Sequence, residues 1–167
     1  MEYKDNIVSV RQEQELVQYL DSRRWHAKGT RRVQSYGCRY DSATREVVPA
    51  DPIEYPLDVL KRLVEDRYMI RGNIQCYVNE YTMCSGISDH IDPYVFGDSV
   101  AVVSLLDRCT VVFTHVVTGV TRRVHLEPRS ILVFRHNYRN TYTHRIEVGE
   151  HAHPEYRRLS VTFRCVC

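Results

Sequence analysis

Two histidines and an aspartate supply the residue types of a metal site. One residue separates His90 from Asp92, and His144 follows later in the chain. Alternate side chains of a β-strand project to the same face, so His90 and Asp92 can ligate one ion from a single strand. Two imidazoles and one carboxylate on one face of an octahedral ion leave three positions open, as is typical of non-haem Fe(II) sites. The spacing therefore predicts an iron site that is open to substrate.

Other histidines compete with His144 for the role of distal ligand, namely His136, His151 and His153. Residues 142–146 alternate between polar and apolar side chains as a strand does, whereas His151 and His153 lie in a segment flanked by glycine and proline. We therefore favour His144.

The segment 158–164 also alternates between two faces. Its apolar face, Leu159, Val161 and Phe163, suits a protein core. Its polar face consists of Arg158, Ser160, Thr162 and Arg164. The two arginines are roughly 20 Å apart along an extended backbone, and the planar fork of each guanidinium can pair with a carboxylate. This face can therefore bind a small dicarboxylate. Asn79 and Tyr81 add an amide and a phenol on one face of another predicted strand.

Taken together, these motifs resemble the AlkB family of Fe(II)/2-oxoglutarate dioxygenases. Asn79-x-Tyr81, His90-x-Asp92, His144 and Arg158-x5-Arg164 stand in the order and spacing of that family. Segments 31–40, 79–81 and 86–92 resemble more closely the AlkB homologue that hydroxylates wobble uridine in tRNA. The resemblance covers about residues 25 to 164.

The resemblance implies a set of ligands and cosubstrates. His90, Asp92 and His144 would bind Fe(II), and the cosubstrates would be 2-oxoglutarate and O2. Arg158 would pair with the distal carboxylate of 2-oxoglutarate, and Arg164 would orient Asp92. The remaining cosubstrate residues would be Asn79, Tyr81 and Ser160. Ser160 departs from the pattern, because many relatives carry asparagine there.

Periodicity predicts a mainly β fold after two helices, at residues 12–20 and 56–70. The expected strands are 73–81, 99–106, 109–117, 120–126, 130–135, 141–146 and 157–164. Many short strands after early helices favour a double-stranded β-helix (jelly-roll or cupin-like) core, braced by the two N-terminal helices. We expect residues 1–167 to form a single dioxygenase domain and a monomer.

Composition gives weaker constraints. The chain has 167 residues, no apolar run long enough to span a bilayer, and a polar N-terminus unlike a signal peptide. Its six cysteines are scattered, which favours free thiols in a reducing compartment, cytoplasmic or nuclear. Cys165 and Cys167 could form half of a zinc site, but a frayed tail with free thiols is the interpretation that we favour.

Local charge indicates a partner. The formal net charge is only +2, yet the residues between Ser22 and Tyr40 include six basic side chains and no acid. Aromatic side chains are interleaved with them, so the segment can contact phosphates and stack bases. The resemblance places a nucleotide-recognition segment at residues 25–50, and the expected contacts in it are Arg31, Arg32, Tyr36 and Arg39. The alternative is a solvated edge strand whose charges prevent aggregation.

We therefore expect oxidation of a nucleic-acid base, by oxidative dealkylation or by hydroxylation of a modified tRNA uridine. The expected partner is RNA, including tRNA, or another single-stranded or alkylated nucleic acid, with no membrane involved. Three alternatives remain: a protein side-chain hydroxylase or demethylase, a non-catalytic metal-binding cupin, and a non-catalytic RNA-binding module.

Overall fold

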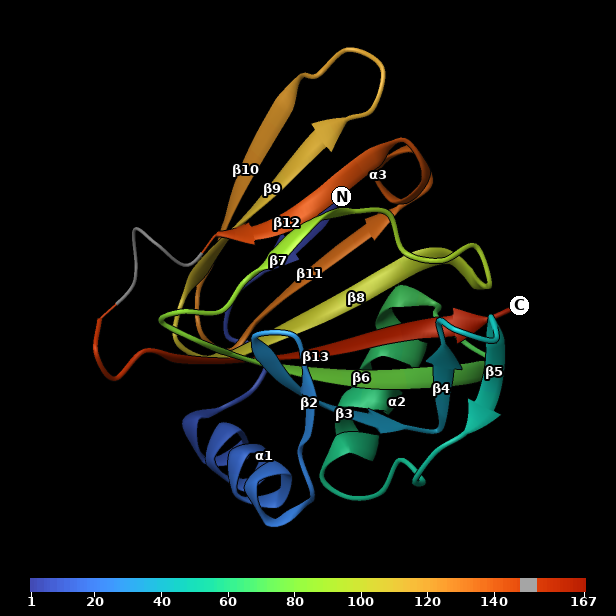
Figure 1. Cartoon of the computed structure of the whole chain (residues 1–167). Coiled ribbons are helices and arrows are strands. Elements are labelled where there is room, and N and C mark those ends of the chain that lie inside the picture. The colour runs from blue at the N-terminus through green and yellow to red at the C-terminus, as the bar shows by residue number, and fades with distance from the viewer. Residues whose placement is uncertain (148–152) are drawn as a thin grey trace.

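A computed structural model describes residues 1–147 and 153–167. Two antiparallel sheets form the body of the protein (Figure 1). The larger sheet has the order β1-β11-β8-β13-β6-β3-β2. Its strands are β1 (Glu2–Lys4), β2 (His26–Lys28), β3 (Arg31–Tyr36), β6 (Asn73–Thr82), β8 (Phe96–Leu106), β11 (Ser130–Arg135) and β13 (Arg157–Val166).

The smaller sheet has the order β10-β9-β12-β7. It consists of β7 (Ile87–His90), β9 (Cys109–His115), β10 (Thr121–Leu126) and β12 (Tyr142–Glu147). A separate two-stranded sheet pairs β4 (Cys38–Asp41) with β5 (Glu46–Pro49). The result is the mainly β, jelly-roll architecture that the periodicity predicts.

Two helices brace the outer face of the larger sheet, as expected (Figure 1). Helix α1 (Val10–Ser22) begins with a capping box. The Ser9 hydroxyl accepts a hydrogen bond from the Gln12 backbone N–H, and the Gln12 side chain accepts one from the Ser9 backbone N–H. Helix α2 (Leu57–Tyr68) directs Leu57, Leu60 and Val64 into the core. Complete burial of an aliphatic side chain stabilises the fold by about 1.5–3 kcal/mol.

Strand β13 lies at the centre of the larger sheet, between β6 and β8. Its apolar residues Leu159, Val161 and Phe163 pack in the same core as the two helices. The register with β6 places Arg158 opposite Tyr81 and Ser160 opposite Asn79. The polar faces of β13 and β6 therefore lie side by side on the inner surface of the sheet.

The predicted strands from residue 73 onward are confirmed with small shifts of their ends. Periodicity did not predict strands β1 to β5, because each has only three to six residues, and β7 was expected only as the strand that carries His90. The short helix α3 (Asn137–Asn140) was missed for the same reason. The prediction of a frayed tail is wrong, since β13 pairs with its neighbours as far as Val166.

All six cysteines are free thiols. Within the described residues, no helix is long and apolar enough to cross a membrane.

Candidate active site

Pairing between two strands of the smaller sheet brings the metal-ligating residues together. β12 pairs with β7 so that His144 lies directly opposite His90, with 4.3 Å between the ring centroids. Asp92 follows just beyond the end of β7, and its Oδ1 lies 3.8 Å from His90 Nε2. One ligand atom from each residue lies within 4.8 Å of the others. The prediction that His90 and Asp92 share one strand is therefore wrong, although the two side chains do converge.

Of the competing histidines, His136 and His153 are exposed and stand outside this group. His151 lies outside the described residues. Within the part of the chain that is described, His90, Asp92 and His144 are the group that could hold a metal ion.

Electrostatics keep the aspartate ionised. Burial by itself would raise the pKa of the Asp92 carboxyl, but the Arg164 guanidinium, with His144 and His90, lowers it to about 2. Arg164 Nη1 lies 2.6 Å from Asp92 Oδ1, as the sequence prediction for this arginine requires. Gln75 accepts a hydrogen bond from Arg164 Nε at 2.9 Å, and the guanidinium packs on the Phe96 ring. Asp92 is therefore an anionic ligand held in a fixed orientation.

The histidine from β12 is held in its neutral form. Burial lowers the pKa of His144 to about 4, even though Asp92 acts in the opposite direction. At neutral pH the imidazole therefore has a free lone pair with which to bind a metal ion.

Arg158 forms the other end of the site and is fully buried. Its Nη2 donates to the Ser104 hydroxyl at 2.8 Å, and its guanidinium lies 5.3 Å from the centre of the Tyr81 ring. Among the described residues, no hydrogen-bond partner reaches the buried Nε and Nη1 atoms. Buried donors of a charged group are costly when they have no partner. Arg158 therefore fits an anionic ligand such as the distal carboxylate of 2-oxoglutarate.

A cavity of about 320 Å³ joins the two ends. It is lined by the metal-ligating group and by every residue that was predicted for the cosubstrate: Asn79, Tyr81, Arg158, Ser160 and Arg164. The donor set suits the expected groups, because two imidazoles and one carboxylate fit Fe(II) and two buried guanidiniums fit a dicarboxylate.

Sequence reasoning missed several residues of this cavity. Gln75 and Tyr77 line it from β6, on the same face as Asn79 and Tyr81. Extending the period-two pattern toward the N-terminus of that strand would have found both. Ser104 bonds Arg158 from β8, and no pattern in the sequence indicates this contact.

The structure corrects the predicted nucleic-acid contacts. Tyr36 is only 2% exposed, and its hydroxyl donates to the Gln34 side chain, so the prediction that its ring stacks a base is wrong. Arg31 lines the metal-containing cavity and bonds Asn79. Arg39 is exposed on β4 and lines a second cavity.

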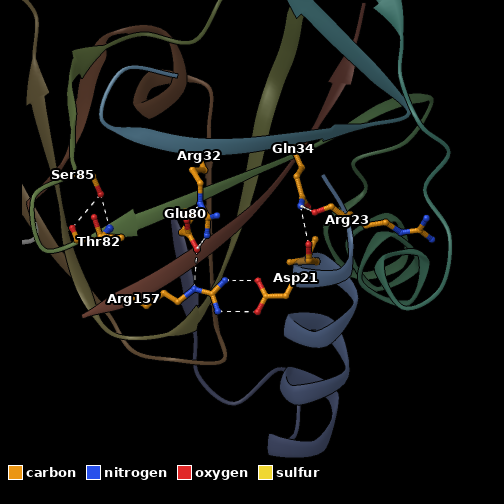
Figure 2. A network of polar contacts seen from close by, with 9 residues as sticks. Asp21, Arg23, Arg32, Gln34, Glu80, Thr82, Ser85 and Arg157 are labelled. Carbon is orange, nitrogen blue, oxygen red and sulfur yellow. Dashed lines mark hydrogen bonds and ion pairs between the residues drawn. The ribbon is translucent and has the colours of Figure 1, made fainter. Parts of the chain in front are cut away.

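Arg32 is not the uncompensated charge that was expected. It donates two hydrogen bonds to Glu80, which also accepts one from Arg157 (Figure 2). Arg157 in turn pairs with Asp21 at the end of α1. This network, Asp21–Arg157–Glu80–Arg32, lies on the face of the sheet opposite the cavity and joins α1, β13, β6 and β3.

Comparison with known proteins agrees with this site. The model of the 2OG-Fe(II) oxygenase superfamily matches residues 2–164. The chain is 26% identical over 168 residues to "Alkylated DNA repair protein ALKBH8 homolog" of Arabidopsis thaliana, covering 84% of this chain but only 49% of the relative. It is 22% identical to uncharacterized protein L905 of Acanthamoeba polyphaga mimivirus, covering 93% of this chain and 79% of the relative. The chain thus spans about half the length of the Arabidopsis protein.

Two solved structures share the fold. OsALKBH1 superposes with a TM-score of 0.75 at 16% identity, covering 98% of this chain and 97% of that chain. A prolyl-4-hydroxylase of Pseudomonas putida superposes with a TM-score of 0.67 at 13% identity, covering 99% and 92%. The AlkB homologues among these proteins support the resemblance that the motifs indicate. The chain therefore belongs to the 2OG-Fe(II) oxygenase superfamily, and its residues form an Fe(II)- and 2-oxoglutarate-dependent dioxygenase domain.

Proposed function

We propose that this dioxygenase oxidises a base in single-stranded nucleic acid, with RNA as the first candidate, by oxidative dealkylation or by hydroxylation of a modified uridine. When bound, iron and 2-oxoglutarate supply the O2-dependent oxidation of a substrate C–H bond. One observation carries the proposal: a second cavity, of about 540 Å³, adjoins the first. The two cavities share the lining residues Lys28, Tyr40, Ser42 and Tyr77.

The chemistry of the second cavity suits a nucleotide. Lys28 and Arg39 are exposed cations at its edge, and Tyr40 and Tyr77 offer aromatic faces between the two cavities. Basic groups beside stacking platforms are the usual means of binding single-stranded nucleic acid. The Tyr40 ring also packs edge-on against Phe96 at 5.9 Å, the residue that supports Arg164. A base stacked on Tyr40 would lie next to the metal-ligating group.

Each group of residues has a separate role in this proposal. His90, Asp92 and His144 hold the metal ion, and Arg164 orients Asp92 from behind. Arg158 binds the distal carboxylate of the cosubstrate, with Tyr81, Asn79 and Ser160 beside it. Lys28 and Arg39 bind phosphate. A base that is already exposed in a single-stranded loop does not have to be flipped out of a duplex. We place this activity inside the cell, in the cytoplasm or nucleus, and in a monomer.

The test combines charge removal with a salt titration. Lys28→Gln and Arg39→Gln should each weaken RNA binding across sequences and lower the salt slope by about one. Arg11→Gln is the matched control, because it removes one positive charge from a side chain that is 88% exposed on α1. RNA affinity of both test variants equal to that of wild type at every salt concentration would contradict the proposal. Mass spectrometry of nucleosides after incubation with total RNA would identify the base.

The alternative is oxidation of a protein side chain. The prolyl-4-hydroxylase of Pseudomonas putida has the same fold, and the fold does not decide the substrate. A protein that is oxidised while no nucleic acid is bound at low salt would replace the first proposal with this one.

A further inference from the structure

Arg31 lies inside the cosubstrate end of the site, although it comes from the basic segment of the sequence. It is the first residue of β3, and it lines the cavity that contains the metal-ligating group. Its Nη1 donates to Asn79 Oδ1 at 2.7 Å. Its guanidinium lies 5.8 Å from the Tyr81 ring, to which Arg158 also lies close at 5.3 Å. The next residue, Arg32, points to the opposite face and bonds Glu80 (Figure 2).

The chemistry of this contact decides which way the amide of Asn79 points. A guanidinium has five N–H donors and no acceptor, so only the carbonyl oxygen of an amide can face it. Asn79 is 6% exposed, and therefore few other partners can compete for the oxygen. With Oδ1 held by Arg31, the NH2 group is the end of the amide that remains for a ligand. An NH2 donor attracts a carboxylate or keto oxygen, whereas the carbonyl end would repel it.

We propose that Arg31 is a positioning residue for the cosubstrate, which fixes the Asn79 amide so that its NH2 group donates to 2-oxoglutarate. This inference rests on the proposed role of Asn79 in cosubstrate binding. It separates Arg31 from the phosphate-binding residues, because Arg31 acts through Asn79 and not on the nucleic acid.

The position of Arg31 also connects two parts of the enzyme. In the β2–β3 pairing Arg31 lies directly opposite Lys28, which we propose binds phosphate. One short hairpin therefore carries a substrate contact on one strand and the residue that orients Asn79 on the other. A shift of this hairpin on substrate binding would change the hydrogen bond between Arg31 and the Asn79 amide.

The experiment measures 2-oxoglutarate binding by calorimetry, with Zn(II) in place of Fe(II) so that no turnover occurs. Arg31→Met removes the donor, and its affinity should fall roughly tenfold. Arg31→Glu attracts the NH2 end and turns the carbonyl toward the cosubstrate, so its affinity should fall further. Arg31→Lys keeps a cationic donor and should remain within about threefold of wild type. Arg11→Met, on the exposed face of α1, is the matched control.

A double-mutant cycle separates action through Asn79 from direct action on the anion. In an Asn79→Ala background, Arg31→Met should change affinity by less than about twofold. A tenfold loss that persists in that background would overturn the inference, because Arg31 would then act on 2-oxoglutarate by its own charge. An Arg31→Lys variant that folds and binds Zn(II) yet loses affinity as Arg31→Met does would overturn it as well.

The cycle also distinguishes failure of the underlying proposal. If Asn79→Ala alone binds 2-oxoglutarate like wild type, then the cosubstrate role of Asn79 is wrong and the inference falls with it. If Asn79→Ala weakens binding but Arg31→Met does not, only the inference is wrong.

Discussion

The metal-ligating residues owe their properties to their immediate neighbours. Asp92 is ionised because Arg164 touches it, and His144 is neutral because partial burial lowers its pKa. Both states are the ones that a divalent cation needs from its ligands. The site is therefore prepared for metal before any metal arrives.

At this scale the choice of distal histidine can be tested. His144→Ala should abolish 2-oxoglutarate decarboxylation, because the remaining imidazole and carboxylate cannot hold the ion in place. The control is His136→Ala, which changes an exposed histidine directly after β11 of the larger sheet and should retain wild-type turnover. The measurement is release of CO2 from labelled 2-oxoglutarate, together with iron content. Normal turnover by His144→Ala would show that the ligand group is wrong.

Arg158 is the second residue whose chemistry can be tested singly. Arg158→Lys should raise the 2-oxoglutarate requirement roughly 10- to 100-fold, because an ammonium cannot reproduce the donors of the planar fork. Saturation curves for decarboxylation measure this effect. Arg164→Lys should act mainly on iron binding, since Arg164 contacts Asp92. Curves for Arg158→Lys that coincide with those of wild type would assign this buried arginine to the fold alone.

Strands β6 and β13 have the cosubstrate residues on one face and a stabilising network of ion pairs on the other. Asn79 and Arg158 face the cavity, and their chain neighbours Glu80 and Arg157 belong to the outer network. Because side chains alternate, a slip of one residue would exchange the two sets. The ion pairs of the network therefore favour the register that assembles the cosubstrate site (Figure 2).

Glu80→Gln tests the network. Burial would raise the pKa of the Glu80 carboxyl, but the hydrogen bonds from Arg32 and Arg157 lower it below its ordinary 4.5. A lowered pKa means that the stabilisation is complete above pH 4.5 and is lost as the pH falls through the native value. Urea unfolding at neutral pH should show that Glu80→Gln loses about 1–3 kcal/mol of the free energy of unfolding. The free energy of unfolding of this variant should also depend less on pH below 4.5 than that of wild type.

The control for this experiment is Glu54→Gln, whose carboxylate is 58% exposed and 3.8 Å from Arg23. An exposed pair of this kind contributes about 0–1 kcal/mol. Equal losses in the two variants would mean that the outer network has no special part in stability.

The elements also show how far the sequence can be read. The alternation of polar and apolar residues identified the inner face of β13 and half of the inner face of β6, because alternation is a local property of the sequence. The pairing of His144 with His90, the hydrogen bond that Arg158 donates to Ser104 and the contact of Arg32 with Glu80 depend on which strands become neighbours. Segment 23–40 was interpreted as a free basic surface for this reason. The partners of Arg31 and Arg32 lie 48 residues further along the chain, on β6, and a local charge count does not include them.

Stability and cosubstrate binding are linked in the molecule as a whole. 2-Oxoglutarate at about 100 times its dissociation constant, with Zn(II) present, should raise the melting temperature by roughly 5–10 °C. Arg158→Met should lose this increase and should melt without ligand at or above the wild-type temperature, because it removes a buried charge whose Nε and Nη1 have no hydrogen-bond partner among the described residues. Differential scanning fluorimetry measures both effects. An unchanged response to 2-oxoglutarate in Arg158→Met would place the dicarboxylate elsewhere.

The central place of β13 has a consequence for how the protein is made. Its partners β6 and β8 precede it in the chain, and the Arg157–Glu80 contact alone spans 77 residues. Until residues 157–166 leave the ribosome, the larger sheet has a gap at its centre, and β6 and β8 each have one unpaired edge. Contacts of such long range fold slowly. We therefore expect the nascent chain to pass through an aggregation-prone stage and to gain cosubstrate binding and a closed core in the same late step.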